Sequence, residues 1–283
     1  MLAMFAPRHL RLALLAALAT GCVFGYRGAV PFAGEATLAG IDTVIIDLPP
    51  TELQLTGVAD AIDVTWQGRF VALGASRKDA LAQAERLDPS WESWERIGRL
   101  YADLPADLES ISQLEQIRIE SAATLAHEIH GEGSLFVSGI DAFLSIDMVS
   151  GSVEVYGGLD EIRVELGTGS VVLRTAARVE VESGGGPVEL ELDDPRATRV
   201  DCEGSVDIAL AITDDLAIDI AEAGEIVVDL DEVAHLGKGS FQRNLGDASR
   251  PLRVRAGGGR VELRMLGADA DTTDSTDSTT GAP

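Results

Sequence analysis

A glycine recurs along this chain at a nearly fixed interval, each time at the start of a short segment in which apolar and polar residues alternate. The pairs are Gly133-Ser134, Gly151-Ser152, Gly169-Ser170, Gly186-Pro187, Gly204-Ser205 and Gly224-Glu225, with successive intervals of 18, 18, 17, 18 and 20. The next clear instance, Gly259-Arg260, lies roughly two periods further on. A nearly constant period of this length indicates a repeat architecture in which successive units stack.

The unit at residues 151–168 shows what one repeat contains. Its apolar residues alternate with polar ones on both sides of a glycine turn, at Val153 and Val155 and then at Ile162, Val164 and Leu166. Alternation puts each apolar row on one face of a strand, and stacking equivalent strands buries that face. The sequence therefore predicts an all-β fold in which residues 133–266 form a parallel β-solenoid with about 18 residues per turn. Regular strand spacing also suits an antiparallel β-sandwich, which is the alternative.

Four segments carry a resemblance to a known family: residues 151–159 (GSVEVYGGL), 167–173 (GTGSVVL), 180–190 (EVESGGGPVEL) and 254–263 (VRAGGGRVEL). They resemble the bacterial DUF4097-type, adhesin-like domain, also called the auto-transporter adhesin head or toast-rack domain. The resemblance covers about residues 37–266. It implies a β-solenoid-like fold, a place in the cell envelope and an interaction role, and it supplies no catalytic residue.

Residues 1–21 have the order of a bacterial export signal. Arg8 and Arg11 make the start basic, and the apolar run from Leu12 to Ala19 is too short to span a bilayer. Cleavage after residue 21 would remove two of the 22 basic residues and no acidic one, leaving a net charge of −27.

The signal ends in Leu18-Ala19-Thr20-Gly21-Cys22, which resembles a lipobox. This resemblance predicts that Cys22 becomes the diacylated N-terminus and that residues 22–36 form a linker. Two acyl chains would anchor the chain stably to a membrane. In a Gram-negative cell, Val at position 23 implies the outer membrane, by resemblance to known lipoproteins. Ordinary signal peptidase cleavage after Ala19 is the alternative.

Residues 37–132 are expected to contain strands that begin the solenoid, with a helical insertion at residues 76–104. Ser76, with Asp79 three residues later, has the form of a helix N-cap, and Ser90 would begin a second helix. The second helix would place four apolar residues on one face: Trp91, Trp94, Ile97 and Leu100. We expect this face to pack over the end of the solenoid; an aromatic ridge for a glycan or a partner is the alternative.

Residues 267–283 have no apolar periodicity and predict a disordered acidic tail. Their four aspartates could bind calcium only weakly, because they lack a fixed arrangement of oxygen ligands.

The remaining residues give no pattern of catalysis or metal binding. His127 and His130 are spaced by three, so on the predicted strand they would face opposite ways. Cys202 is in phase with Val200, which indicates a buried cysteine. No nucleophile elbow, phosphate loop or dinucleotide fingerprint occurs, and acidic pairs such as Asp193-Asp194 are expected by chance among 47 acidic residues. The sequence thus predicts no catalytic, cofactor or metal site.

The net charge and the export signal together predict the functional class of the protein. A net charge of −25 excludes nucleic acid as a partner, because no basic stripe could neutralise phosphates. We expect a non-enzymatic envelope protein with an adhesin-like role, anchored through the diacylglycerol on Cys22 and binding a protein or glycan of the cell surface. The alternatives are a sensing or regulatory module for envelope stress and a polysaccharide-active β-helix enzyme.

Overall fold

The computed structural model describes residues 25–105, 107–108, 112–211 and 214–267. Within these residues the chain is nearly all β-structure, with one α-helix, α2 (Arg77–Ala84). The strands in chain order are β1 (Tyr26–Thr37), β2 (Thr43–Asp47), β3 (Thr51–Val58), β4 (Asp63–Gly74), β5 (Ser90–Trp94), β6 (Ile97–Tyr101), β7 (Ser112–Ala122), β8 (Ala126–Ser138), β9 (Leu144–Tyr156), β10 (Glu161–Thr175), β11 (Arg178–Ser183), β12 (Val188–Leu192), β13 (Thr198–Cys202), β14 (Val206–Leu210), β15 (Leu216–Leu230), β16 (Val233–Asn244), β17 (Arg250–Arg255) and β18 (Arg260–Met265). The predicted all-β class is confirmed.

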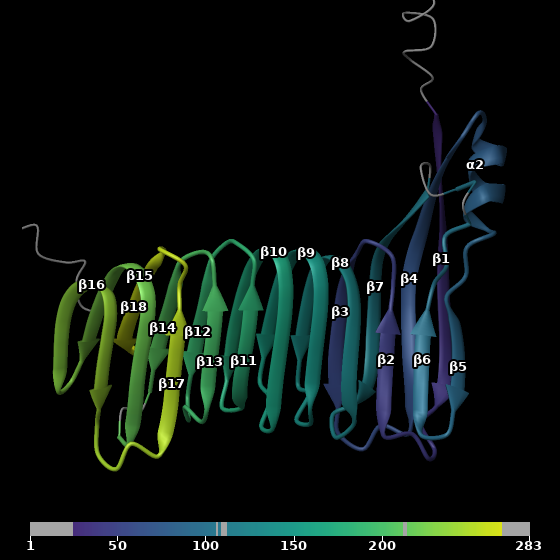
Figure 1. The fold of residues 1–283 in the computed structure, drawn as a ribbon. Helices are drawn as coiled ribbons and strands as arrows, with labels where there is room; N and C mark the ends of the chain where they lie inside the picture. Colours follow the sequence, from purple (N-terminus) through teal and green to yellow (C-terminus); the bar gives the residue numbers. More distant parts are fainter. Residues whose placement is uncertain (1–24, 106, 109–111, 212–213, 268–283) are drawn as a thin grey trace, which may run out of the picture.

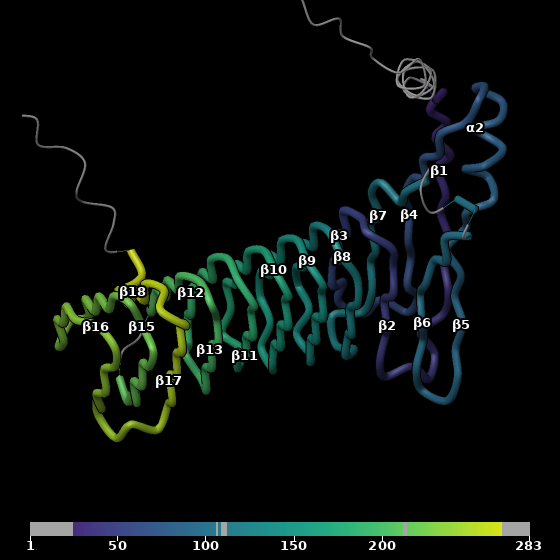
Figure 2. The backbone as a smooth tube through the Cα atoms, turned by 45° about the horizontal axis from the view of Figure 1, so that its top comes forward, coloured from purple at the N-terminus to yellow at the C-terminus, as the bar shows by residue number. Residues whose placement is uncertain are grey.

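The strands lie side by side in two layers that enclose one apolar core (Figures 1 and 2). The first halves of the long strands β8, β9, β10 and β15 belong to one layer, and their second halves belong to the other. For this reason eight strands close into a ring in the order β10-β11-β13-β17-β15-β18-β14-β12. Every pairing within this ring is parallel, so the antiparallel sandwich is wrong.

Strands in the middle of the stack are offset by the repeat length that the sequence indicates. β9 and β10 pair Val153 with Val171, and β12 and β14 pair Val188 with Val206, so the partners lie one period apart in the chain. The inward side chains form columns of fully or almost fully buried residues, such as Leu135, Val153, Val171, Val188, Val206 and Val261. Burying each of these side chains stabilises the fold by roughly 1.5–3 kcal/mol.

A column of glycines turns the chain from one layer to the other. Gly151, Gly169 and Gly186 have φ angles of 128°, 141° and 102°, which side chains rarely allow. A Cβ atom on Gly151 or Gly169 would lie 1.7 Å from the carbonyl oxygen of the glycine one turn earlier, and a Cβ on Gly186 would lie 1.8 Å from the corresponding oxygen. Both the backbone angle and the close approach require glycine, which explains the recurring glycine in the sequence.

The stack does not follow chain order at its C-terminal end, contrary to the expectation that successive units stack through residue 266. β14 pairs with β18, so Val206 meets Val261, and β15 lies outside them. β15 is then covered by β16, which pairs with it antiparallel. The predicted continuous order is therefore wrong after β14, because the β15–β16 hairpin intervenes in the chain.

The N-terminal end has the same out-of-order arrangement. β2 and β3 lie between β8 and the pair β6 and β7, although β2 and β3 come first in the chain. Antiparallel strands then cover the end: β5 pairs with β6, β4 pairs with β7, and β1 pairs with β4. The parallel stack thus begins at residue 43, within the segment expected to begin the solenoid and before the regular glycine repeat that starts at residue 133.

Charge favours the position of β17 and β18 between earlier strands. Residues 250–265 contain five arginines and one glutamate, whereas the adjacent strand β15 has four carboxylates and no basic residue, and β13 and β14 have one carboxylate each. The Arg255 guanidinium lies 3.9 Å from the Asp201 carboxylate on β13 and 3.6 Å from the Glu222 carboxylate on β15. Each exposed ion pair contributes little alone, but the basic pair of strands relieves repulsion between like charges on adjacent strands.

The predicted helical insertion at residues 76–104 is correct only in its first part. Ser76 Oγ accepts a hydrogen bond from the Asp79 N–H at 3.1 Å, and α2 follows. The helix lies so close to β1 and β4 that a Cβ on Gly28 or Gly74 would come within 2.5 Å of the Ala80 backbone.

The expected second helix is instead the hairpin of β5 and β6. Trp91 points inward, where a Cβ on Gly98 would lie 2.2 Å from its ring, and it stacks on Trp66 with ring centroids 6.2 Å apart. Trp94 pairs with Ile97 across a turn in which Glu95 has a φ of 53°. Aromatic residues fit a half-buried pleated surface well. The contact between Trp91 and Trp66 therefore outweighs the helical spacing of the apolar residues.

Most of the predicted linker at residues 22–36 is strand β1, which pairs with β4 along 12 residues. One of its inward positions, Gly34, has no room for a side chain, because a Cβ there would lie 2.4 Å from the Trp66 ring. Glycines at positions 28 and 34 flank the inward Val30 and Phe32, so the apolar row of β1 is short. The signal at residues 1–21, Cys22 and all but Gly267 of the predicted tail lie outside the described residues. In the part that the structure describes, no helix is long and apolar enough to cross a membrane.

Candidate ligand-binding face

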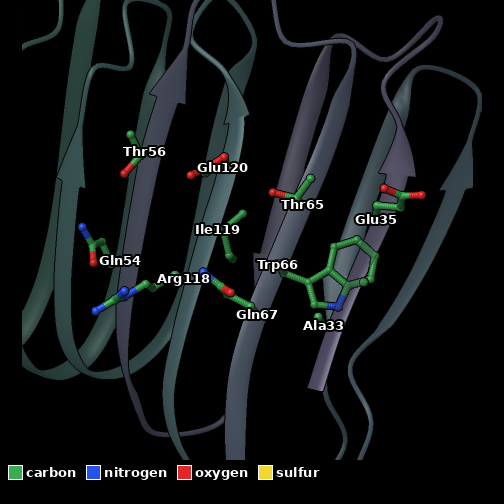
Figure 3. A pocket seen from close by; sticks show the side chains of 11 residues that line it. Ala33, Glu35, Gln54, Thr56, Thr65, Trp66, Gln67, Arg118, Ile119 and Glu120 are labelled. Carbon is green, nitrogen blue, oxygen red and sulfur yellow. The ribbon is translucent and has the colours of Figure 1, made fainter. Parts of the chain in front are cut away.

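The outer surface of β1, β4, β7 and β3 contains a depression of about 800 Å³, called here the Arg118 depression (Figure 3). It is lined by Ala33, Gly34, Glu35, Gln54, Thr56, Thr65, Trp66, Gln67, Arg118, Ile119 and Glu120. Most of its outward side chains are polar, and its floor is the backbone of four adjacent strands.

Strand alternation explains why these polar groups face outward. On β7, Ile117 and Ile119 are fully buried in the core, so Arg118 between them points to solvent. Register then sets its neighbours: Arg118 pairs with Gln67 of β4 on one side and with Gln54 of β3 on the other. Two amides therefore flank one guanidinium at the strand spacing of about 4.8 Å.

Arg118 has no ion-pair or hydrogen-bond partner among the described residues. This is unusual in the chain, because fourteen of the eighteen arginines that the structure describes form ion pairs. Arg69 lies two residues after Gln67 on β4, and the Glu115 carboxylate neutralises it. The donors of Arg118 are thus open to an outside group, as are the polar atoms of Gln54 and Gln67, which have no partner in the described chain.

Two further depressions continue the Arg118 depression along the same face. One, of about 690 Å³, shares Ala33, Gln67 and Arg118 with it. The other, of about 440 Å³, shares Gln54 and extends over β3, β8 and β9. The hollowed surface therefore crosses six strands, from β1 to β9.

An aromatic pair lies beside the third depression. Phe136 pairs in register with Gln54, is 36% exposed, and lies 5.3 Å from Tyr156 between ring centroids. The Arg174 guanidinium covers the Tyr156 ring at 5.3 Å and also forms an ion pair with Glu191 at 3.0 Å. The aromatic pair is thus held in place on the side away from the Arg118 depression.

Two carboxylates lie in one row of the Arg118 depression. Glu35 pairs with Thr65, and Thr65 pairs with Glu120, so the two carboxylates are two strands apart. Both are exposed to solvent. A glycosidase general acid usually needs an apolar pocket, and these residues lack one.

His127 and His130 face opposite ways, as expected for two residues spaced by three on a strand. His127 is fully buried, and His130, 43% exposed at its side chain, lies 3.7 Å from Asp147. Burial lowers the pKa of His127 to about 4, although its Nδ1 is 2.9 Å from the Leu125 carbonyl oxygen. Its Nε2 has no partner in the described chain. Within the described residues no three His, Cys, Asp or Glu side chains could hold a metal ion.

Cys202 is buried as the sequence indicated, at 1% exposure. Burial raises the pKa of its thiol, the Gly204 N–H donates to Sγ at 3.0 Å, and the thiol lies 3.4 Å from the Gly186 carbonyl oxygen. It therefore behaves as a core residue. Cys22 lies outside the described residues, so its lipidation stays a prediction.

The amino-acid sequence alone did not predict the Arg118 depression. The alternation of residues 116–120 indicates that Arg118 is exposed, but Gln67 and Gln54 come from two separate segments much earlier in the chain. Only the pairing of β7 with both β4 and β3 brings these groups together.

No protein-family model matches the chain, and no curated protein matches it. Solved structures give weak similarity. A proposed cell adhesion protein from Clostridium sporogenes is 15% identical, with 84% of this chain and 99% of that chain covered and a TM-score of 0.36. A proposed adhesin from Bacteroides fragilis is 11% identical, with 83% and 97% covered and a TM-score of 0.26.

Proposed function

We propose that this protein is a non-enzymatic, adhesin-like binding protein of the cell envelope, anchored by diacylglycerol on Cys22. The observation that supports this most is the Arg118 depression, whose central groups are polar, outward and without partners in the described chain. A rigid sheet that leaves such groups open is suited to hold a ligand by hydrogen bonds. The partner would be a protein or glycan at the cell surface.

We further infer that the stack works as a β-solenoid in which each turn is one sequence period and each end is closed by antiparallel strands. The pairing of Val153 with Val171 and of Val188 with Val206 supports this architecture. Core columns that run through consecutive turns make a stiff body, so a bound ligand would meet a surface that is already ordered.

The anchor would keep this body close to the membrane. Only four residue steps separate Cys22 from Tyr26, the first residue of β1, and they span at most about 14 Å. The Arg118 depression includes residues of β1 itself, so it would lie at the anchored end of the stack. A cell-surface ligand that lies close to the anchoring membrane fits this arrangement best.

Metabolic labelling with a palmitate analogue tests the anchor. We expect label and membrane association in the wild type, loss of both in Cys22→Ala, and no change in Cys202→Ala, the matched control. Unlabelled wild-type protein in the soluble fraction would show that the export signal is cut elsewhere and that the protein is not lipid-anchored.

Cell binding tests the adhesin-like role. We expect cells that display the protein to bind intact bacterial cells or isolated envelopes better than cells without it, and Arg118→Ala to reduce this binding. Polysaccharide cleavage that is lost in Glu120→Gln would instead favour the hydrolase alternative, for which the row containing Glu35 and Glu120 is the one relevant observation.

A further inference from the structure

We propose that the Arg118 depression binds an uncharged glycan that lies across the strands from β1 towards β9. This inference rests on the proposed binding function and adds the ligand class and the residues that contact it. Three features of the face lead to it: the polar groups at its centre, the aromatic ring at its side, and its charge.

The polar groups suit hydroxyls. The Arg118 guanidinium presents several N–H donors in one plane, and each neighbouring amide, Gln54 and Gln67, presents a donor pair and an acceptor. Neighbouring hydroxyls of a sugar ring can donate and accept at the same time, so they match groups of both kinds. No intramolecular hydrogen bond of these three side chains has to break first, because none is formed in the described residues.

The aromatic ring suits the apolar face of a sugar. Phe136 lies one strand beyond Gln54 and therefore about 10 Å from Arg118 across the sheet. A sugar ring has C–H groups on its faces, and a partly exposed aromatic ring can bury them. Tyr156, whose ring lies 5.3 Å away, supports Phe136 on its far side.

Charge indicates that the glycan is neutral. Glu35 and Glu120 lie in the Arg118 depression, and Glu52 and Glu154 lie in the depression next to it. Arg118 is the one cation of this surface that no carboxylate neutralises in the described chain. A uronic acid or a sulfated sugar carries negative charge. The four carboxylates of this surface and the net charge of −25 of the whole chain would repel such a sugar.

The length of the face favours an oligosaccharide over a single sugar. The three connected depressions cross the strands β1, β4, β7, β3, β8 and β9, which is about 24 Å of sheet. Contacts to Arg118 and Phe136 together need a ligand longer than one ring. We therefore expect affinity to rise with chain length until the face is filled.

Calorimetry with defined hexasaccharides tests the proposal. The neutral probes are the β-1,4-linked hexamers of glucose, xylose and N-acetylglucosamine and the β-1,3-linked hexamer of glucose; the anionic probes are galacturonate and heparin hexasaccharides. We expect a neutral hexamer to bind with an affinity that added salt leaves unchanged. Arg118→Ala and Phe136→Ala should each weaken it about tenfold or more.

The control is Arg253→Ala. Arg253 is also exposed and without an ion pair in the described residues, but it lies on β17 in the other layer. We expect this variant to bind like the wild type, and far-UV circular dichroism should show that all three variants are folded.

The outcomes separate this inference from the proposed function. Binding of anionic hexamers alone would overturn the ligand class, and neutral binding unaffected by Arg118→Ala and Phe136→Ala would overturn the site. If no saccharide binds while cells still adhere, the glycan inference fails and the adhesin-like role stands. If neither saccharides nor cells bind, both fail.

Discussion

Replacing Gly186 by alanine should destabilise the protein by about 3–5 kcal/mol. Its φ of 102° is a strained region for alanine, which costs about 1–3 kcal/mol. The new Cβ would lie 1.8 Å from the Gly169 oxygen, whereas ordinary contact begins at 3.4 Å. Relieving this clash would stretch the neighbouring hydrogen bonds from Gly169 N–H to Gly185 O and from Val171 N–H to Pro187 O, both 3.0 Å long. Losing two such bonds costs about 2 kcal/mol.

The adjacent residue provides a matched control. A Cβ on Gly185 would meet no atom within 4 Å, and Gly185 has no positive φ. Gly185→Ala should therefore leave stability unchanged within about 0.5 kcal/mol, or raise it by up to about 1 kcal/mol by stiffening the unfolded chain.

Urea unfolding followed by far-UV circular dichroism measures both variants, and hydrogen exchange locates the change. We expect Gly186→Ala to lose protection in β10, β12 and β14 first, because interactions in a stacked repeat are between neighbours. If the stabilities of the two variants differ by less than about 1 kcal/mol, then the corner is not closed by contact between glycines and the recurring glycine is not required there.

Three further predictions concern buried residues. The pKa of His127 is lowered by burial to about 4 from 6.5, so the unfolded chain takes up a proton that the folded chain does not. Stability should therefore fall as the pH drops from 6.5 towards 4, by about 2 kcal/mol at pH 5, and urea titrations of His127→Leu should lack this loss. Cys202, with its raised pKa, should react with iodoacetamide slowly when native and quickly in urea, and rapid native reaction would contradict its burial. Leu263→Ala, at a fully buried position of β18, should cost about 2–5 kcal/mol in urea unfolding, and a cost below about 1 kcal/mol would mean that β18 does not lie inside the stack.

The middle of the fold could be predicted from sequence because its signals are local. Each turn contains its own glycine corner and its own alternating valines and leucines, and the strand beside it is the equivalent segment one period later. The buried Cys202 follows from the same alternation.

The ends and the Arg118 depression could not be predicted, since they depend on pairings between distant segments. Trp91 and Leu100 fit helical spacing as well as a strand, and only contact with Trp66 decides between them. Gly34 of β1 lies against the Trp66 ring, a contact that no local pattern indicates. Likewise, the sequence shows that Arg118 is exposed but not that its neighbours leave it unpaired.

The out-of-order ends bear on how such a chain could change its length in evolution. A duplicated repeat added after β18 would have no neighbour to pair with, because β18 lies between β14 and β15. A repeat added before β2 would likewise have no free neighbour, because β2 lies between β6 and β8. New turns can therefore enter only in the interior, between strands such as β9 and β10 that follow one another in both sequence and space. Each insertion must also preserve the alternation, because a shift by one residue would expose the apolar row and bury the polar one.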